Sequence, residues 1–286
     1  MNFLDYSIGE LIDLGPGSYS VYVPKNYPIE LLRRLIAATK SHSMGISLSQ
    51  TYNQYLMDWN PTEDIIVDDL RTSLLNQIYE NVIQFTLRTL KHLSENRKSF
   101  VNLSDTNAFY FAEATIMRLE MSFKMSVQTL RFGLPYDANA LLKLILEQTC
   151  WAYSVFNIQD DSFMKIKPNS AISIAKKEFH DVGILYGKIN EYAHLSPEKI
   201  SELFLHGKLA IKMNDNLKSL EVLTSLIEIL DLYCIVFEKM YCDQAFKKHY
   251  IDENRSVLKD RQTIRYLEDL QSQIEVYTFK LKQYPA

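Results

Sequence analysis

The sequence predicts an all-α protein, a multi-helix bundle of long antiparallel helices preceded by a short N-terminal extension. Its 286 residues are 47% hydrophobic and 23% charged, which is enough apolar material for a sizeable core. Glycine and proline occur eight times each, and neither appears between Thr62 and Phe132 or between Lys208 and Tyr284. Such long stretches without helix breakers favour long helices over a sandwich or barrel with many turns.

The first sixty residues differ from the rest because they hold four of the glycines and three of the prolines. A Gly-Pro-Gly turn at residues 15–17 precedes residues 18–23, whose alternating β-branched and aromatic side chains predict one short strand. A helix is expected over residues 30–40, because Pro28 suits the first turn of a helix. We therefore expect residues 1–60 to form an extension that packs on a helical body.

Helical periodicity dominates residues 61–286. Leu74, Ile78 and Val82 belong to a row of apolar residues that recur every three or four positions, as on the buried face of a helix. The run at residues 140–147 is apolar on more than one side, which predicts a central helix. The expected helices span residues 61–96, 104–131, 137–156, 170–180, 182–194, 217–246 and 262–282, and another begins near Ser196.

Charge and cysteine usage exclude several classes of protein. Thirty-one basic and thirty-five acidic residues give a net charge of −4, so a generally basic surface for nucleic acid is not expected. The three cysteines, Cys150, Cys234 and Cys242, lack C-x-x-C spacing, which argues against a disulfide framework or a zinc site. A reducing, cytoplasmic location is expected, because the N-terminus lacks a signal-peptide pattern and no apolar run is long enough to span a membrane.

The common catalytic motifs are absent from the sequence. It contains no phosphate-binding P-loop, no dinucleotide-binding glycine motif and no G-x-S-x-G nucleophile turn. Its six histidines show no H-E-x-x-H spacing. The sequence therefore predicts neither a cofactor nor a metal site.

One segment, residues 186–194, combines side chains suited to proton transfer. On a helix, Asn190 and His194 lie about 40° apart on one face, and Glu191 lies about 60° from His194. Lys188 lies one and a half turns before His194. A histidine beside a cation and an amide can pass a proton while its neighbours hold a phosphate. The alternative is structural, because a histidine at a helix end also stabilises the last turn or packs in the core.

The string Asn190-Glu191-Tyr192-Ala193-His194 resembles the second half of the R-N-x-x-A-H signature of HEPN domains. These domains are helical bundles that often act as metal-independent ribonucleases in toxin and phage-defence systems. The turn at Arg131, the apolar run after it and Glu147 extend the resemblance to an uncharacterised bacterial branch of this group, over residues 61–246. The family places an arginine four to six residues before the histidine, where this chain has Lys188.

The resemblance implies an endoribonuclease. His194 would deprotonate a ribose 2′-hydroxyl or protonate the leaving 5′-oxygen, while Lys188 and Asn190 would steady the phosphate. Two protomers would place their motifs across a shared cleft, and cleavage would leave a 2′,3′-cyclic phosphate without a metal or cofactor. The substrate would be RNA such as tRNA, and a toxin-like role implies an inhibiting partner. The alternative is a helical binding module, for a protein or a nucleic acid, that keeps the fold without the chemistry.

Glu147 stands out as a carboxylate in an otherwise apolar helix. Burying it without a partner would be costly. Lys143, one turn earlier, is the local candidate, whereas Arg118, Arg131 or His194 would reach it from another helix. A contact with His194 would let Glu147 orient the imidazole ring as the third member of an acid–base set.

A short basic strip is expected beside the histidine. Lys176, Lys177, His180 and Lys188 would form it, and it is the place on the chain best suited to bind RNA. Charge clusters of this size are also typical of solvated helix faces. The many aromatic side chains at helical spacing are more typical of a core than of a platform for stacking bases.

Overall fold

The computed structural model describes most of the chain beyond residue 69 and parts of the N-terminal region. The described residues are 9–13, 20–24, 34, 37–38, 41, 45, 47–55, 69–101, 103–104, 106–131, 134–193 and 216–283. The chain divides into two compact units, Met1–Ser73 and Leu74–Ala286.

The first unit contains a β-hairpin. β1 (Gly9–Asp13) pairs antiparallel with β2 (Ser20–Pro24), and Leu11 lies opposite Tyr22. β2 confirms the strand predicted over residues 18–23. β1 is an additional strand, and its pairing with β2 gives both strands the backbone hydrogen bonds that a lone strand would lack.

A short helix follows later in the first unit. α2 (Leu48–Tyr55) begins after Ser47, whose Oγ accepts a hydrogen bond from the backbone N–H of Gln50 at 3.2 Å. A serine in this position satisfies one of the free N–H groups at a helix start. The helix expected over residues 30–40 lies largely outside the described residues.

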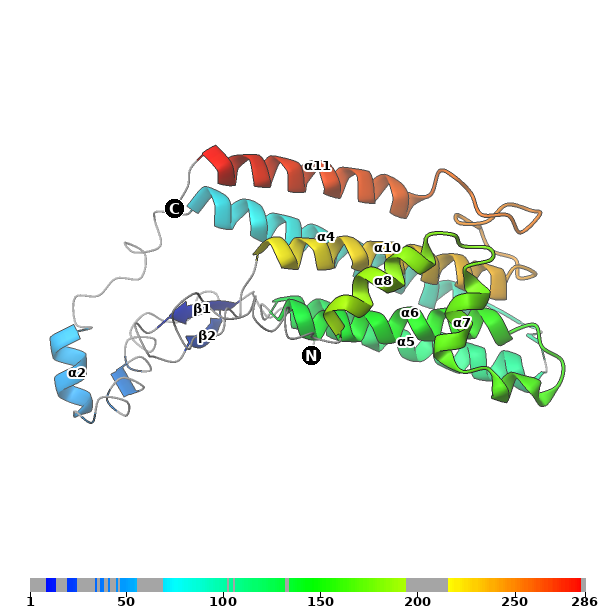
Figure 1. Cartoon of the computed structure of the whole chain (residues 1–286), viewed down its shortest axis with the longest axis horizontal. Coiled ribbons are helices and arrows are strands. Elements are labelled where there is room, and N and C mark those ends of the chain that lie inside the picture. Colours follow the sequence, from blue (N-terminus) through cyan, green and yellow to red (C-terminus); the bar gives the residue numbers. More distant parts are fainter. Residues whose placement is uncertain are drawn as a thin grey trace. The chain divides into compact units, whose positions relative to one another are not determined.

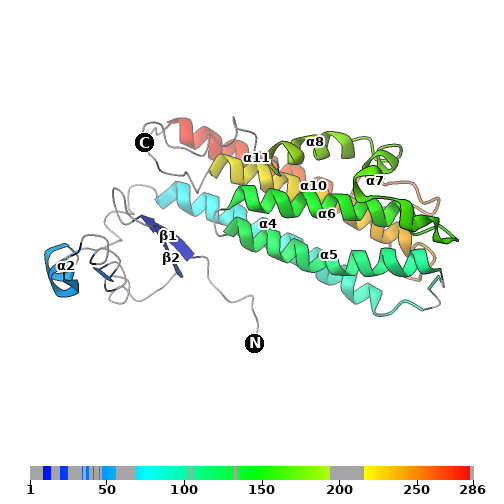
Figure 2. The same ribbon diagram turned by 60° about the horizontal axis from the view of Figure 1, so that its bottom comes forward.

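Long helices supply most of the second unit and run side by side (Figures 1 and 2). They are α4 (Asp69–Arg97), α5 (Asn107–Arg131), α6 (Pro135–Val155), α10 (Asn216–Met240) and α11 (Gln262–Gln283). Three shorter elements follow α6, namely η3 (Asp161–Lys165), α7 (Pro168–Ala175) and α8 (Val182–Ala193). This architecture confirms the all-α multi-helix bundle predicted from the sequence.

Local side-chain chemistry explains where several of these helices begin. The Thr106 hydroxyl accepts a hydrogen bond from the N–H of Phe109 at 3.2 Å and so caps the start of α5. α6 starts at Pro135, whose fixed φ suits a first helical residue. η3 starts after Asp160, which accepts a hydrogen bond from the N–H of Ser162 at 2.9 Å.

The core of the second unit surrounds α6, as its apolar run predicts. Leu142, Ile145 and Leu146 of α6 are fully buried. α6 packs on α5, α7, α8 and α10. Every residue from 229 to 240 of α10 is also buried, so α10 contributes a second central helix. Each large apolar side chain buried in this way contributes about 1.5–3 kcal/mol.

α10 ends earlier than the helix predicted over residues 217–246, because Met240 is its last residue. The carboxylate of Glu238 explains the difference. It accepts hydrogen bonds from the backbone N–H groups of residues 249–251 at 2.7, 2.7 and 3.1 Å. The chain must turn back after Met240 to bring these N–H groups to Glu238, and a longer helix would prevent that turn.

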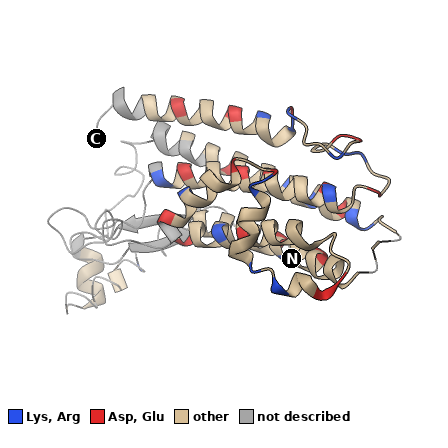
Figure 3. Ribbon diagram, turned by 45° about the vertical axis from the view of Figure 1, so that its right-hand side comes forward, with Lys and Arg blue, Asp and Glu red and all other residues tan. Residues whose placement is uncertain are grey.

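Two expected helix starts lie outside the described residues, at residues 61–68 before α4 and near Ser196. Figure 3 shows acidic and basic residues interspersed over the described helices. None of the described helices combines the length and the apolar character needed to cross a membrane.

Candidate functional site

A polar contact joins α6 to α8 at the two segments that the sequence singles out. The hydroxyl of Tyr186 on α8 donates a hydrogen bond to Oε1 of Glu147 on α6 at 3.0 Å. The Lys143 ammonium lies over the Tyr186 ring, 5.8 Å from its centroid. We refer to Lys143, Glu147 and Tyr186 as the α6–α8 site.

Helix periodicity places these three side chains together. Lys143 and Glu147 lie one turn apart on α6, beside the buried face formed by Leu142 and Leu146. α8 likewise buries Ile189, while Tyr186 stays half-buried. The polar edges of the two helices therefore meet next to an apolar contact, which shields their hydrogen bond from water in part.

The α6–α8 site affects the ionisation of its neighbours. Burial raises the pKa of Tyr186, and the hydrogen bond to Glu147 and the charge of that carboxylate raise it further. The phenol therefore stays protonated and remains a donor to Glu147. Burial, followed by the nearby charge of Glu147, raises the pKa of the Cys150 thiol to about 12. Cys150 is thus a neutral core residue rather than a nucleophile.

The structure gives Glu147 a partner that the sequence did not single out. The sequence offers four candidate partners, Lys143, Arg118, Arg131 and His194, whereas the hydrogen bond comes from Tyr186. Arg118 of α5 instead donates to Oε1 of the adjacent Gln148 at 2.6 Å. The Arg131 side chain and His194 lie outside the part of the chain whose side chains are described.

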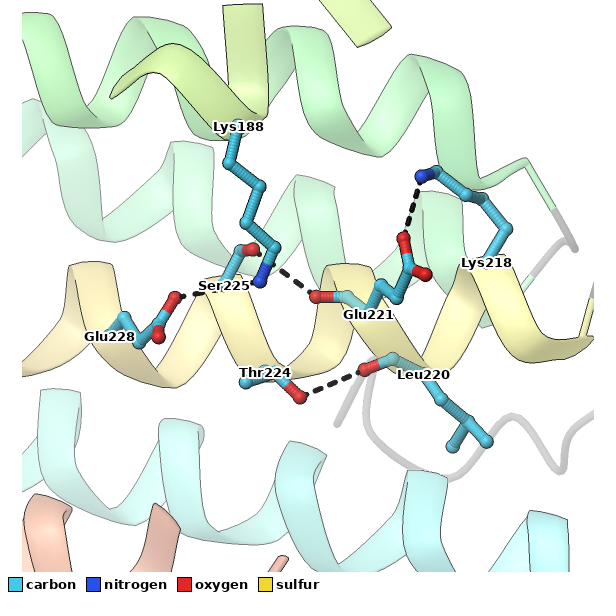
Figure 4. A network of polar contacts seen from close by, with 7 residues as sticks. All are labelled: Lys188, Lys218, Leu220, Glu221, Thr224, Ser225 and Glu228. Carbon is cyan, nitrogen blue, oxygen red and sulfur yellow. Dashed lines mark hydrogen bonds and ion pairs between the residues drawn. The ribbon is translucent and has the colours of Figure 1, made fainter. Parts of the chain in front are cut away.

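Lys188 lies toward α10 and not toward the α6–α8 site. Its ammonium forms an ion pair with Glu228 of α10 at 3.9 Å, with both side chains about one-third exposed (Figure 4). Burial raises the pKa of Glu228; the charge of Lys188 opposes this rise, and that of Asp181 adds to it. The ion pair joins α8 to α10, and the phosphate-binding role expected for Lys188 stays a prediction.

The residues of the expected basic strip lie at the end of α7, in the segment after it and on α8. The Lys176 side chain crosses Gly183, where any added Cβ would overlap it. His180 and Lys188 line a cleft of about 510 Å³ between α8, α10 and the start of α11. The acidic residues in the same lining are Glu178, Asp181, Glu228 and Asp231. This cleft is therefore mixed in charge. Lys177 is exposed nearby in the chain, and the basic strip stays a prediction.

Asn190 is the remaining predicted residue in the described part of α8. It lies one turn after Tyr186 and is half-buried. Tyr186 belongs to the segment of residues 186–194 that the sequence indicates, but the sequence predicts no role for its side chain. Its spacing of four from Asn190 is the signal that would have placed both on one helix face.

The described residues contain no group of three or more histidine, cysteine or acidic side chains that could hold a metal ion. Comparison of the chain with protein-family models, with curated proteins and with solved structures found no match. The candidate site therefore rests on the contact between α6 and α8.

Proposed function

We propose that the chain is a metal-independent endoribonuclease of HEPN type, in a toxin or phage-defence role, with its active site beside α6 and α8. The observation that supports this proposal is the hydrogen bond from Tyr186 to Glu147. It joins Glu147 to residues 186–194, and the sequence indicates each of these features independently. The two bonded residues are 39 positions apart in the chain.

In this proposal His194 is the general acid and base. It follows directly after Ala193, the last residue of α8. The α6–α8 site positions the helix that leads to His194, because Glu147 holds Tyr186 by a hydrogen bond across the two helices. Asn190 would contact the phosphate. Lys188 is the cation that the resemblance assigns to the phosphate, and Lys143, which lies over the Tyr186 ring, is proposed as a second one.

The proposed RNA-cleaving form is a dimer of two copies that pair through α5. Met117, Met121 and Met125 form an exposed row at a spacing of four, with exposed fractions of 56%, 61% and 51%. The row is symmetric about Met121. A two-fold axis at that residue would therefore place Met117 of one protomer against Met125 of the other, as an isologous helix contact requires. Flexible thioether side chains adapt well to such a contact.

A second candidate is a helical binding module that keeps the fold without catalysis. It is favoured by the Lys188–Glu228 ion pair, which occupies the one cation at the arginine position of the family signature. The acidic lining of the cleft next to His180 also favours it over RNA binding at that cleft. In this case the exposed row on α5 would bind the partner.

The two candidates differ in an assay with total tRNA in the presence of EDTA. The first predicts cleavage products with 2′,3′-cyclic phosphate ends from the wild-type chain and none from His194→Ala. Lys98→Ala is the matched control, because Lys98 is an exposed cation outside α6, α8 and the expected basic strip. Equal products from the wild type and His194→Ala, or none from either, would overturn the first candidate.

A further inference from the structure

A separate cleft of about 660 Å³ lies between α4 and α11. The end of α10 and the segment after it close one side of the cleft. None of its lining residues belongs to the α6–α8 site. Its volume is within the usual range for the binding of a small ligand. We call it the α4–α11 cleft.

The charged and titratable residues that face this cleft come from every element around it. They are Arg88 and His92 of α4, Glu238 of α10, His249 and Tyr250 of the following segment, and Arg265, Tyr266 and Asp269 of α11. Glu238 and Arg265 are among those held by other groups. Glu238 accepts hydrogen bonds from three backbone N–H groups. Arg265 forms an exposed ion pair with Asp260 at 2.5 Å.

Arg88 is the available cation of the cleft. It is exposed, and no described carboxylate pairs with it. Its charge acts on the Tyr266 hydroxyl, where it opposes the rise in pKa that burial produces. The guanidinium and the phenol both belong to residues that line the cleft.

The Tyr266 hydroxyl is buried and has no hydrogen-bond partner among the described residues. Its ring stacks on Phe85 of α4, with centroids 3.9 Å apart and planes 3° from parallel. This stack fixes the ring, so the hydroxyl cannot turn away to find a partner. Burying an unsatisfied hydroxyl is unfavourable, and a shift of the covering side chains that lets a ligand acceptor reach it from the cleft would relieve this cost.

Two histidines complete the arrangement. The rings of His92 and His249 meet edge to face with centroids 6.1 Å apart. Nε2 of His92 accepts from the amide of Asn96 at 3.2 Å, which leaves its Nδ1–H as a donor. The backbone of His249 is fixed by its hydrogen bond to Glu238 at 2.7 Å.

We propose that the α4–α11 cleft binds a small soluble phosphomonoester. Arg88, the two imidazole rings and the Tyr266 hydroxyl are donors of the kind that phosphate oxygens accept. Asp269 is the one carboxylate of the lining without a hydrogen bond or ion pair among the described residues, and it is outnumbered by these donors. The site is independent of the proposed ribonuclease activity.

The test measures binding of inorganic phosphate and of AMP to the full chain by isothermal titration calorimetry. We expect wild-type binding at about 1 mM ligand or below, and a loss of about tenfold in Arg88→Gln. Lys91→Gln is the matched control, because Lys91 lies on the same helix, pairs with Glu95 at 3.8 Å and does not line the cleft. Sulfate at the same ionic strength distinguishes a phosphate site from a general anion site.

Tyr266→Phe separates binding from folding. It keeps the stack on Phe85 and removes only the unpartnered hydroxyl, so the denaturation midpoint should stay equal or rise while phosphate affinity falls. The proposal would be overturned if neither phosphate nor AMP binds, or if sulfate binds as tightly as phosphate. Equal losses of affinity in Arg88→Gln and Lys91→Gln, or an unchanged affinity in Tyr266→Phe, would also overturn it.

Discussion

Arg261 and Asp231 form a two-point ion pair that joins the start of α11 to the middle of α10. Nε donates to Oδ1 at 2.8 Å and Nη2 donates to Oδ2 at 2.7 Å. The two side chains are only 13% and 11% exposed. The Thr263 hydroxyl donates to the same carboxylate. Planar guanidinium and carboxylate groups in this arrangement fix orientation as well as distance.

Removing the carboxylate charge of this pair should destabilise the protein strongly. Asp231→Asn leaves the buried Arg261 charge uncompensated, which costs about 3–5 kcal/mol in comparable pairs. The measurement is urea unfolding followed by circular dichroism. Asp260→Asn breaks the exposed pair with Arg265 and should leave the midpoint unchanged. A similar midpoint for both variants would show that burial does not decide the strength of these pairs.

Removing the Tyr186 hydroxyl should affect catalysis more than folding. Tyr186→Phe loses one hydrogen bond to Glu147 and should cost about 1 kcal/mol of stability. If the bond positions the helix before His194, the rate of RNA cleavage falls about tenfold, or about 1.4 kcal/mol in the barrier. The pH–rate profile should also shift.

Tyr153→Phe is the control for this experiment, because Tyr153 also donates to a glutamate, Glu178, outside the α6–α8 site. A purely structural role for Tyr186 would lower the stability of both variants and leave both pH–rate profiles as in the wild type.

Glu178 should contribute to the acid sensitivity of the fold. Burial tends to raise the pKa of this carboxyl, but hydrogen bonds from Lys239 and Tyr153 and the charge of Lys239 outweigh it and lower the pKa below 4.5. The stabilisation is therefore present above about pH 4.5 and is lost as the pH falls through the lower pKa of the folded state.

Glu178→Gln should consequently flatten the acid side of a plot of melting temperature against pH. Glu253→Gln, a change at an exposed residue, is the control and should leave the slope as in the wild type. An unchanged slope in Glu178→Gln would contradict the role assigned to its contacts with Lys239 and Tyr153.

Two isoleucines of α8 provide a matched test of packing. Ile189 has no exposed surface, whereas Ile184 is 71% exposed. Ile189→Ala should lower the unfolding free energy by about 2–5 kcal/mol, because it removes buried methyl groups and leaves a cavity. Ile184→Ala should change it by less than about 0.5 kcal/mol. Equal effects, measured by urea unfolding, would mean that α8 does not pack on α6 through Ile189.

A charge in the exposed row of α5 should prevent association of two copies. Met121→Glu places carboxylates of both protomers at the proposed two-fold axis, where they would repel each other. Light scattering after size-exclusion chromatography should then give the monomer mass, with the wild type at the dimer mass. Met164→Glu changes a methionine that is 66% exposed outside α5 and should leave the dimer intact. A monomeric wild type would contradict the dimer.

The long helices could be predicted because their signals are local. The Thr106 cap and the apolar rows of α5 and α6 each lie within a few residues of the helix that they specify. The end of α10 could not be predicted in this way. It depends on Glu238 reaching backbone N–H groups more than ten residues later, and no local pattern encodes that contact.

The candidate site was predicted only in part for the same reason. Glu147 stands out because a carboxylate is unusual in an apolar helix, and this signal is visible in the sequence. Its partner Tyr186 lies 39 residues away, and the pairing depends on how α8 packs on α6. Lys188 is a second example, because helical spacing within α8 does not reveal its ion pair with Glu228 of α10.

In the proposed dimer, the methionine row on α5 would also make association sensitive to oxidants. Peroxide converts an accessible thioether to a polar sulfoxide, whereas a thioether covered by a second protomer reacts slowly. Met117, Met121 and Met125 are accessible in the single chain. Their rate of sulfoxide formation would therefore report which fraction of the protein is dimeric. Once oxidised, these polar side chains would prevent two copies from associating, while the helical core stays intact.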